Sequence, residues 1–262
     1  MMNYYVTLPS NGSDLTSEWG KRNNTKSDFE TELKIPLSLE YKKYEVGLTE
    51  FSYRRSWKIN LGHFKLINYE SKTILFDDNI YVLDGISIMS ASYLMVSYFK
   101  NRVTLSFTQL GQLKIVIGSS LSLEINGYFA SLILDDTGVA KENGDTSTFH
   151  KIDHLTLKGT NTFIITSNSI NVVQEIYIYT NIIDEVHVGS EMLKLLRVVT
   201  VTGKVEENTS VIFILPHYLS LDSSYIDRIR MFICDSQGNK INFIDSHSQV
   251  LYKLHFKLKH LV

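Results

Sequence analysis

Two stretches near the start of the chain alternate apolar and polar residues with the period of a half-buried β-strand. In the first, residues 29–39, one face is charged and carries Glu30, Glu32 and Lys34. The other face is apolar and consists of Phe29, Leu33, Ile35, Leu37 and Leu39. Pro36 lies on the polar face, which suits an edge strand or a bulge because proline cannot donate a ladder hydrogen bond.

The second stretch, residues 44–53, changes phase in its middle. The alternation runs through Leu48 and then slips, since Phe51 and Tyr53 fall on the opposite parity. A bulge near Glu50, or burial of both faces of the strand, would explain the slip.

Strand-forming runs return in the last third of the chain, where β-branched and aromatic residues are separated by turn residues. They are residues 175–181, 196–202, 211–215, 226–234, 240–244 and 250–258. Together with the two N-terminal strands they give eight, the complement of a jelly roll built as two Greek keys.

The middle of the chain also contains helical patterns. Residues 91–98 place apolar side chains at helical spacing, with Ser90 as N-cap, and a second short helix is predicted at 123–134. The strand-like runs of the middle, which include one hairpin, are residues 73–76, 80–83, 103–107 and 113–117.

These patterns predict a mainly β protein, a single jelly-roll β-sandwich with an inserted, partly helical (α+β) second domain. Both chain ends build the jelly roll, so we expect it to comprise residues 1–61 and 170–262. The inserted domain is expected at residues 62–169.

Composition adds little to this picture. The chain has 262 residues, 44% of them hydrophobic and 21% charged, with a formal net charge of −2, so the charge of the whole chain does not predict nucleic-acid binding. The lone cysteine, Cys234, excludes an internal disulfide and is expected to be a buried thiol in a reducing compartment. We expect neither a secretory signal nor a membrane span.

No residue pattern points to catalysis. His150 and His154 are four residues apart and on a helix could share a zinc ion, but the residues that follow them read as a strand. Asp77-Asp78 sits beside turn-like residues, where adjacent carboxylates are usually solvated. Nucleophile-elbow, P-loop and dinucleotide motifs are absent from the sequence. We therefore expect no enzyme and name no catalytic, cofactor-binding or metal-binding residue.

Four residues are candidates for a protein interface. Arg54, Arg55 and Trp57 follow an aromatic strand, and arginine and tryptophan are enriched at interface hot spots. The alternative is an exposed basic turn with Trp57 capping the core. Trp19 stands in a polar stretch without clear periodicity, from which it could anchor on a neighbouring protomer or pack locally.

The C-terminal strand carries a candidate basic face. Lys253, His255, Lys257 and Lys259 alternate with apolar residues. Clustered cations can neutralise DNA phosphates, although four over one short strand would bind only weakly and in a salt-sensitive way. The alternatives are a solvated face or a contact with acidic residues of a partner.

Several phrases of the sequence, taken in their order and spacing, resemble one protein family. They are Tyr-Val-Thr-Leu-Pro-Ser-Asn at 5–11, Glu-Val-Gly-Leu-Thr-Glu at 45–50 with Tyr53 and Trp57, Ile178-Tyr179, Val188-Gly189, Leu195-Leu196-Arg197, His217-Tyr218-Leu219 and Leu254-His255-Phe256. The family is the penton, or minor capsid, proteins of Polinton (Maverick) elements, which are large eukaryotic DNA transposons, and of adintovirus-like viruses. The chain departs from it at Arg54-Arg55, where the family usually has proline, and at Thr180, where it often has cysteine.

The resemblance implies a structural virion protein without cofactors. Five copies would close each icosahedral vertex, with the inserted domain outermost and a double-jelly-roll major capsid protein as partner. The protein would be made in the host cytoplasm or nucleus, would bind nucleic acid weakly at most, and would not contact a membrane.

Two other classes of protein remain open. A β-sandwich binding module, lectin-like or tumour-necrosis-factor-like, would act without catalysis but predicts export. A cupin-type enzyme would require a metal-ligand pattern that the sequence lacks.

Overall fold

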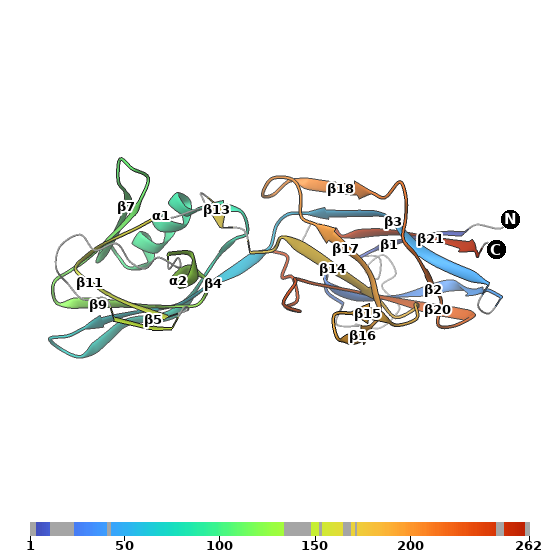
Figure 1. Ribbon diagram of the computed structural model, residues 1–262, viewed down its shortest axis with the longest axis horizontal. Helices are drawn as coiled ribbons and strands as arrows, with labels where there is room; N and C mark the ends of the chain where they lie inside the picture. The colour runs from blue at the N-terminus through green and yellow to red at the C-terminus, as the bar shows by residue number, and fades with distance from the viewer. Residues whose placement is uncertain are drawn as a thin grey trace. The chain divides into compact units, whose positions relative to one another are not determined.

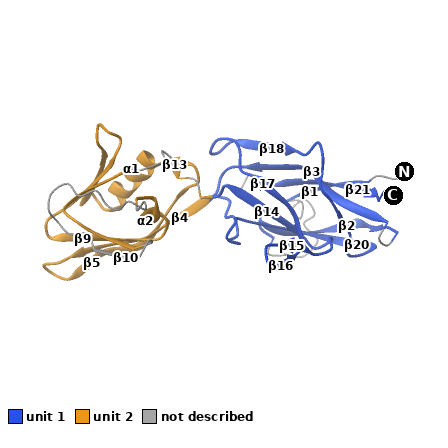
Figure 2. Ribbon diagram, in the orientation of Figure 1, with its two compact units in different colours: residues 1–57, 173–262 blue, residues 58–172 orange. Residues whose placement is uncertain are grey.

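The computed structural model (Figure 1) describes residues 4–10, 24–40, 43–133, 148–151, 154–164, 169–170, 172–244 and 249–259. The chain divides into two compact units, which Figure 2 colours separately. Unit 1 consists of Met1–Trp57 and Val173–Val262, and unit 2 consists of Lys58–Val172. The insert expected at residues 62–169 lies within unit 2.

Unit 1 is a sandwich of two antiparallel sheets, with strand orders β1-β21-β3-β18 and β17-β14-β20-β2. The strands are β1 (Tyr4–Pro9), β2 (Asp28–Ser38), β3 (Tyr44–Arg54), β14 (Glu175–Thr180), β17 (Leu195–Thr200), β18 (Asn208–Ile212), β20 (Tyr225–Cys234) and β21 (Leu251–Leu258). In chain order the first pairs with the eighth, the second with the seventh, the third with the sixth and the fourth with the fifth. A long hairpin rolled into two sheets has this pairing, so the predicted jelly roll is confirmed.

Three short strands complete unit 1 in the described part of the chain: β15 (Val186–Val188), β16 (Glu191–Leu193) and β19 (Tyr218–Ser220). The first two form a hairpin, and β19 pairs with β3 beside β18.

Aromatic side chains from both sheets form the core of unit 1. Phe29 of β2 and Phe51 of β3 both contact Tyr252 of β21, with ring centroids 5.7 and 5.1 Å apart. All three side chains are at most 2% exposed. Large flat rings bury much apolar area at little entropic cost, so these contacts join the two sheets.

The bulge expected near Glu50 is present in β3. The register between β3 and β21 skips Thr49, because consecutive residues of β21 pair with Glu50 and with Leu48. The extra residue shifts the phase of the strand and brings Phe51 and Tyr53 into the core, where both are at most 2% exposed.

Strand β2 lies at an edge of its sheet, as Pro36 indicated. Its register against β20 is irregular between Glu32 and Leu37. The predicted alternation fails there, because Ile35 is 80% exposed instead of facing the core.

The eight strands differ from the predicted set in one member. Residues 240–244 are not a strand, since only Lys240 and Phe243 form isolated bridges, to Cys234 and to Trp57. The Phe243 ring lies nearly perpendicular to the Trp57 ring, with the centroids 5.6 Å apart. Strand β1, which the prediction did not count, is the eighth and pairs with β21.

Unit 2 is built on a sheet of order β10-β11-β9-β4-β5, with both helices on one face (Figure 1). The elements are β4 (Lys58–Asn68), β5 (Thr73–Leu83), β6 (Ile86–Ser87), α1 (Ile88–Tyr98), β7 (Val103–Phe107), β8 (Leu113–Ile117), β9 (Leu121–Asn126), α2 (Tyr128–Ile133), β10 (Thr148–Lys151), β11 (His154–Lys158), β12 (Thr160–Phe163) and β13 (Ser169–Ile170). Phe64 of β4 contacts Phe129 of α2 and Phe99 at the end of α1, which ties both helices to the sheet.

The first predicted helix and the hairpin of β7 and β8 are confirmed. The N-cap is Ser87 rather than Ser90, because the Ser90 backbone N–H donates to the Ser87 Oγ at 3.1 Å. The helix therefore begins one turn earlier than its apolar spacing indicated.

The second predicted helix is wrong in its first half. Leu123 and Ile125 are alternate residues of β9, and both side chains are fully buried. Gly127, with φ of +89°, separates this strand from α2. A short apolar run fits strand and helix equally well, so periodicity alone did not resolve this segment.

Candidate functional site

The predicted basic face lies on the outer surface of the sheet that contains β21. The strand registers place Tyr5, His255, Gly47 and Tyr218 in one row across β1, β21, β3 and β19. We call Tyr5, His255 and Tyr218 the Tyr–His–Tyr cluster.

His255 lies between the two tyrosines. Its ring stacks on Tyr5 with the centroids 4.4 Å apart and the planes 5° from parallel. Its Nδ1 shares a hydrogen bond of 2.8 Å with the Tyr218 hydroxyl. Within the part of the chain that the structure describes, the buried Nε2 has no hydrogen-bond partner.

The surroundings of His255 favour its neutral form. The residue is only 9% exposed, and burial, together with the charge of Lys257, lowers the pKa of the imidazole below its ordinary value of 6.5. At neutral pH His255 therefore adds no charge to the predicted basic face.

Gly47 makes room for the cluster. A Cβ at this position would lie 3.0 Å from the Tyr218 ring and 3.1 Å from the His217 carbonyl oxygen. Only glycine lets the Tyr218 ring lie this close over the sheet and reach His255.

The lysines of the predicted basic face have local partners. Lys257 forms an ion pair with Glu45 at 3.2 Å and lies 3.7 Å from the centroid of the Tyr218 ring. Lys259 donates to the Ser220 Oγ at 2.6 Å, and Lys253 lies 6.0 Å from the Tyr5 ring. The face is thus an aromatic surface with lysines around it, and DNA binding by it stays a prediction.

Trp57 has the core-capping role of the two considered. It is 1% exposed and packs between Tyr53 and Phe243, at centroid distances of 5.9 and 5.6 Å. The side chain is thus buried in this structure, and a role of Trp57 at an interface stays a prediction.

The two arginines contact their own chain. Arg54 Nε donates to the Glu206 carbonyl at 3.0 Å, and Arg55 donates to the Gly203 carbonyl at 2.9 Å. Both side chains are half-buried and hold the turn that precedes β18. A further role of Arg54 and Arg55 in an interface stays a prediction, and Trp19 lies outside the described residues.

Two histidines of unit 2, His63 and His154, each contact one polar side chain. His63 pairs with Asp77, and His154 hydrogen-bonds the Asn126 side chain. His150 belongs to β10, but its side chain lies outside what the structure describes. Among the described residues, no three His, Cys, Asp or Glu side chains gather as metal ligands, and no helix is long and apolar enough to cross a bilayer.

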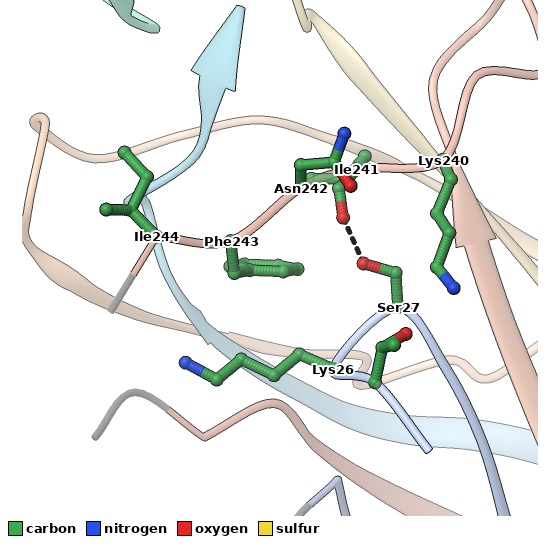
Figure 3. A pocket seen from close by; sticks show the side chains of 8 residues that line it. Lys26, Ser27, Lys240, Ile241, Asn242, Phe243 and Ile244 are labelled. Atoms are coloured by element: carbon green, nitrogen blue, oxygen red, sulfur yellow. Dashed lines mark hydrogen bonds between the residues drawn. The ribbon is translucent and has the colours of Figure 1, made fainter. Parts of the chain in front are cut away.

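A cavity of about 320 Å³ opens in unit 1 between residues 25–27 and 240–244 (Figure 3). Ser27 donates a hydrogen bond to the Ile241 carbonyl across it. Lys240 lies at its rim, 4.0 Å from an Asp28 carboxylate oxygen. Of the described residues that line the cavity, none is acidic or a histidine, so its walls provide no general base.

The sequence did not reveal one surface feature. Ile212, Ile214 and Leu215 are 70%, 90% and 86% exposed, so they form an aliphatic ridge at the end of β18. The predicted strand 211–215 contained this run, but an uninterrupted apolar run is more typical of a buried strand.

No protein-family model and no curated protein matches the chain. Among solved structures, it is similar to the penton protein of mavirus, with 10% identity and a TM-score of 0.46 over 98% of this chain and 100% of that one. A chain in the cryo-electron microscopy structure of the Sputnik virophage is similar at 10% identity and a TM-score of 0.46, over 97% of each chain.

Proposed function

We propose that this chain is a structural virion protein, a penton or minor capsid protein of the Polinton (Maverick) type. The observation that carries the proposal is the jelly roll of unit 1, whose eight strands pair as one rolled hairpin with unit 2 inserted between β3 and β14. All strand pairs of the jelly roll form within unit 1. Unit 1 can therefore supply the contacts of a shell while unit 2 carries a separate role.

The location of the family-like phrases supports the same function. The opening phrase lies in β1, the phrase at 45–50 lies in β3, Ile178-Tyr179 lies in β14 and Leu254-His255-Phe256 lies in β21. These phrases fall on strands of both sheets of the sandwich. The resemblance is thus concentrated in the part that would build the shell.

The proposal has several parts beyond the capsid role itself. Unit 1 associates with copies of itself as a homopentamer at an icosahedral vertex, since head-to-tail contacts around one axis close into a ring. The neighbours of the ring are a double-jelly-roll major capsid protein, and unit 2 forms an outer domain. The protein is made inside the host cell and ends in the virion.

Native mass spectrometry of the purified full chain tests the proposal. We expect an assembly of five chains, each of 30.1 kDa. A stable trimer would instead support the tumour-necrosis-factor-like binding module. If the chain is monomeric alone, co-expression with the major capsid protein of the same genome decides, because absence from the assembled shells would overturn the proposal.

A further inference from the structure

The aliphatic ridge of Ile212, Ile214 and Leu215 is the most exposed apolar feature of unit 1. Single exposed aliphatic residues are common on protein surfaces, but three within four positions of one segment form a patch. A patch of this kind marks a binding surface in a protein that remains soluble.

Contacts with β3 and β17 hold the start of the ridge segment in place. Ile212 pairs with Glu50 in the ladder between β18 and β3. The backbone N–H of Phe213 donates to the Thr49 carbonyl at 2.9 Å, and its ring lies 4.4 Å from the guanidinium of Arg197. Binding to such a preformed surface loses little conformational entropy.

The strand that carries the ridge is an unprotected edge. Among the described strands, β18 pairs with β3 alone. The segment 208–215 contains neither charge nor proline, the features that usually keep an edge from pairing with other chains. Strand β2, an edge of the other sheet, is by contrast irregular in register between Glu32 and Leu37, where Pro36 lies.

Two more exposed apolar side chains lie on the β2 side of the same jelly roll. Ile35 of β2 is 80% exposed, and Tyr225, which begins the neighbouring strand β20, is 58% exposed. Strands β2 and β17 are opposite edges of one sheet. Because Arg197 of β17 contacts Phe213, the ridge lies on the β17 side and Ile35 on the far side.

Each of the two surfaces has both charges near it: Glu50 and Arg197 lie beside the ridge, and the exposed Glu32 and Lys34 precede Ile35 in β2. Glu50 pairs with Ile212 and accepts a hydrogen bond from Ser210 at 3.1 Å. Charges of both signs at the edges of two apolar patches can pair across a contact, and such pairing favours one relative orientation.

We propose that the aliphatic ridge of one copy docks on the β2 side of a second copy, around Ile35. One chain carries both surfaces on opposite sides, so the contact is heterologous and each copy can bind two neighbours. This inference deepens the proposed function because it names the two surfaces through which the copies bind each other. It rests on the proposed function only for the number of copies that form the ring.

Cross-linking between two cysteine variants tests the orientation. The natural Cys234 is buried and is replaced by alanine in both proteins. Ile214→Cys and Ile35→Cys chains, carrying different tags, are mixed and treated with a flexible bis-maleimide. We expect the mixed product to exceed either self-product at least about tenfold. A dominant Ile214-to-Ile214 product would overturn the inference, because it would make the contact isologous.

A charge substitution tests the contribution of the ridge. Ile214→Asp should weaken self-association at least about tenfold, as for a residue near the centre of an interface. Leu110→Asp is the matched control, since Leu110 is an equally exposed leucine in unit 2 at 85%. It should leave association unchanged. Equal effects of the two substitutions, or none from Ile214→Asp, would overturn the inference.

Failure of this inference is distinguishable from failure of the proposed function. A pentamer that survives Ile214→Asp leaves the function standing and overturns the docking surface. A trimer linked through positions 214 and 35 keeps the docking surface and overturns the pentamer. A wild-type chain that neither associates nor cross-links at high concentration overturns the docking surface, and co-expression then tests the function.

Discussion

At the scale of single residues, His255 joins β1 and β19 on the outer face of their sheet. Its ring stacks on Tyr5, and its Nδ1 shares a hydrogen bond with the Tyr218 hydroxyl. A histidine so enclosed makes the stability of the fold depend on pH. Lys257, Lys253 and Glu45 are the charged groups that surround the cluster.

Acidification should destabilise the protein through His255. Its pKa in the folded state lies below 6.5, so the unfolded chain binds this proton at a higher pH than the folded chain does. The stabilisation is therefore present above about pH 6.5 and is lost as the pH falls toward the lower folded value. Chemical denaturation between pH 8 and pH 5 should show a smaller loss for His255→Gln than for wild type.

The exposed His187 supplies the control for that measurement. His187→Gln should keep the pH dependence of the wild type. If both substitutions left the slope of unfolding free energy against pH unchanged, the neutral His255 of the cluster would not be the source of the dependence.

Gly47→Ala should destabilise unit 1 by about 1–3 kcal/mol, the usual cost of overpacking. The new methyl group would meet the Tyr218 ring at 3.0 Å and push it away from His255. Gly118→Ala is the matched control, because its nearest neighbour is a Leu121 methyl group at 3.6 Å. Denaturant titration of both variants measures the difference, and equal costs would refute the role given to Gly47.

At the scale of elements, the sequence predicted strands where alternation was strong and erred where a short run allowed two interpretations. The phase slip of residues 44–53 indicated either a bulge near Glu50 or burial of both faces, and the structure has the bulge, at Thr49, where one extra residue moves every later side chain to the other face. Residues 123–134 were ambiguous, since Leu123 and Ile125 also fit part of a helix face. Only the partners on β4 and β11 make that segment a strand.

The periodicity of the sequence could not predict which apolar side chains at the sheet edges are exposed. Alternation tells which residues share a face but not whether another strand covers that face. Ile35 belongs to an alternating stretch and Ile214 to an apolar run, and both patterns are typical of strands that pack on a core, yet the two side chains are 80% and 90% exposed. The local contacts of Arg54 and Trp57 likewise depend on residues far away in the chain, Glu206 and Phe243.

The contact between β4 and the end of its neighbour β9 leaves no room for a side chain at Gly62. A Cβ there would lie 1.8 Å from the Asn126 carbonyl oxygen, so Gly62→Ala should cost about 3 kcal/mol or more. Gly111→Ala separates this clash from backbone strain, since Gly111 also has a positive φ but nothing within 4 Å. Thermal unfolding of both variants measures the two costs. Equal losses would assign the effect to backbone strain alone.

At the scale of the whole molecule, the two units have separate sheets and separate aromatic cores. The predicted division into a jelly-roll domain and an inserted domain can therefore be tested by excision. A chain in which a Gly-Ser linker replaces residues 60–170 should unfold in one cooperative transition and retain the association of the full chain. Circular dichroism and native mass spectrometry measure the two properties.

Loss of cooperative unfolding in the excised chain would show that the jelly roll needs unit 2 to fold. A folded but monomeric product would place the self-association in unit 2 instead of unit 1. Either result would change the domain roles proposed above.

The position of β21 has a consequence for synthesis. This strand is the last of the jelly roll, yet it lies between β1 and β3 inside its sheet. During translation, β1 and β3 lack β21, the strand that lies between them. At ordinary elongation rates this interval lasts on the order of tens of seconds. The sheet, and with it the row from Tyr5 through His255 to Tyr218, is completed only after residues 251–258 have been translated. Nascent chains on one messenger therefore cannot join through a finished sheet before β21 has been translated.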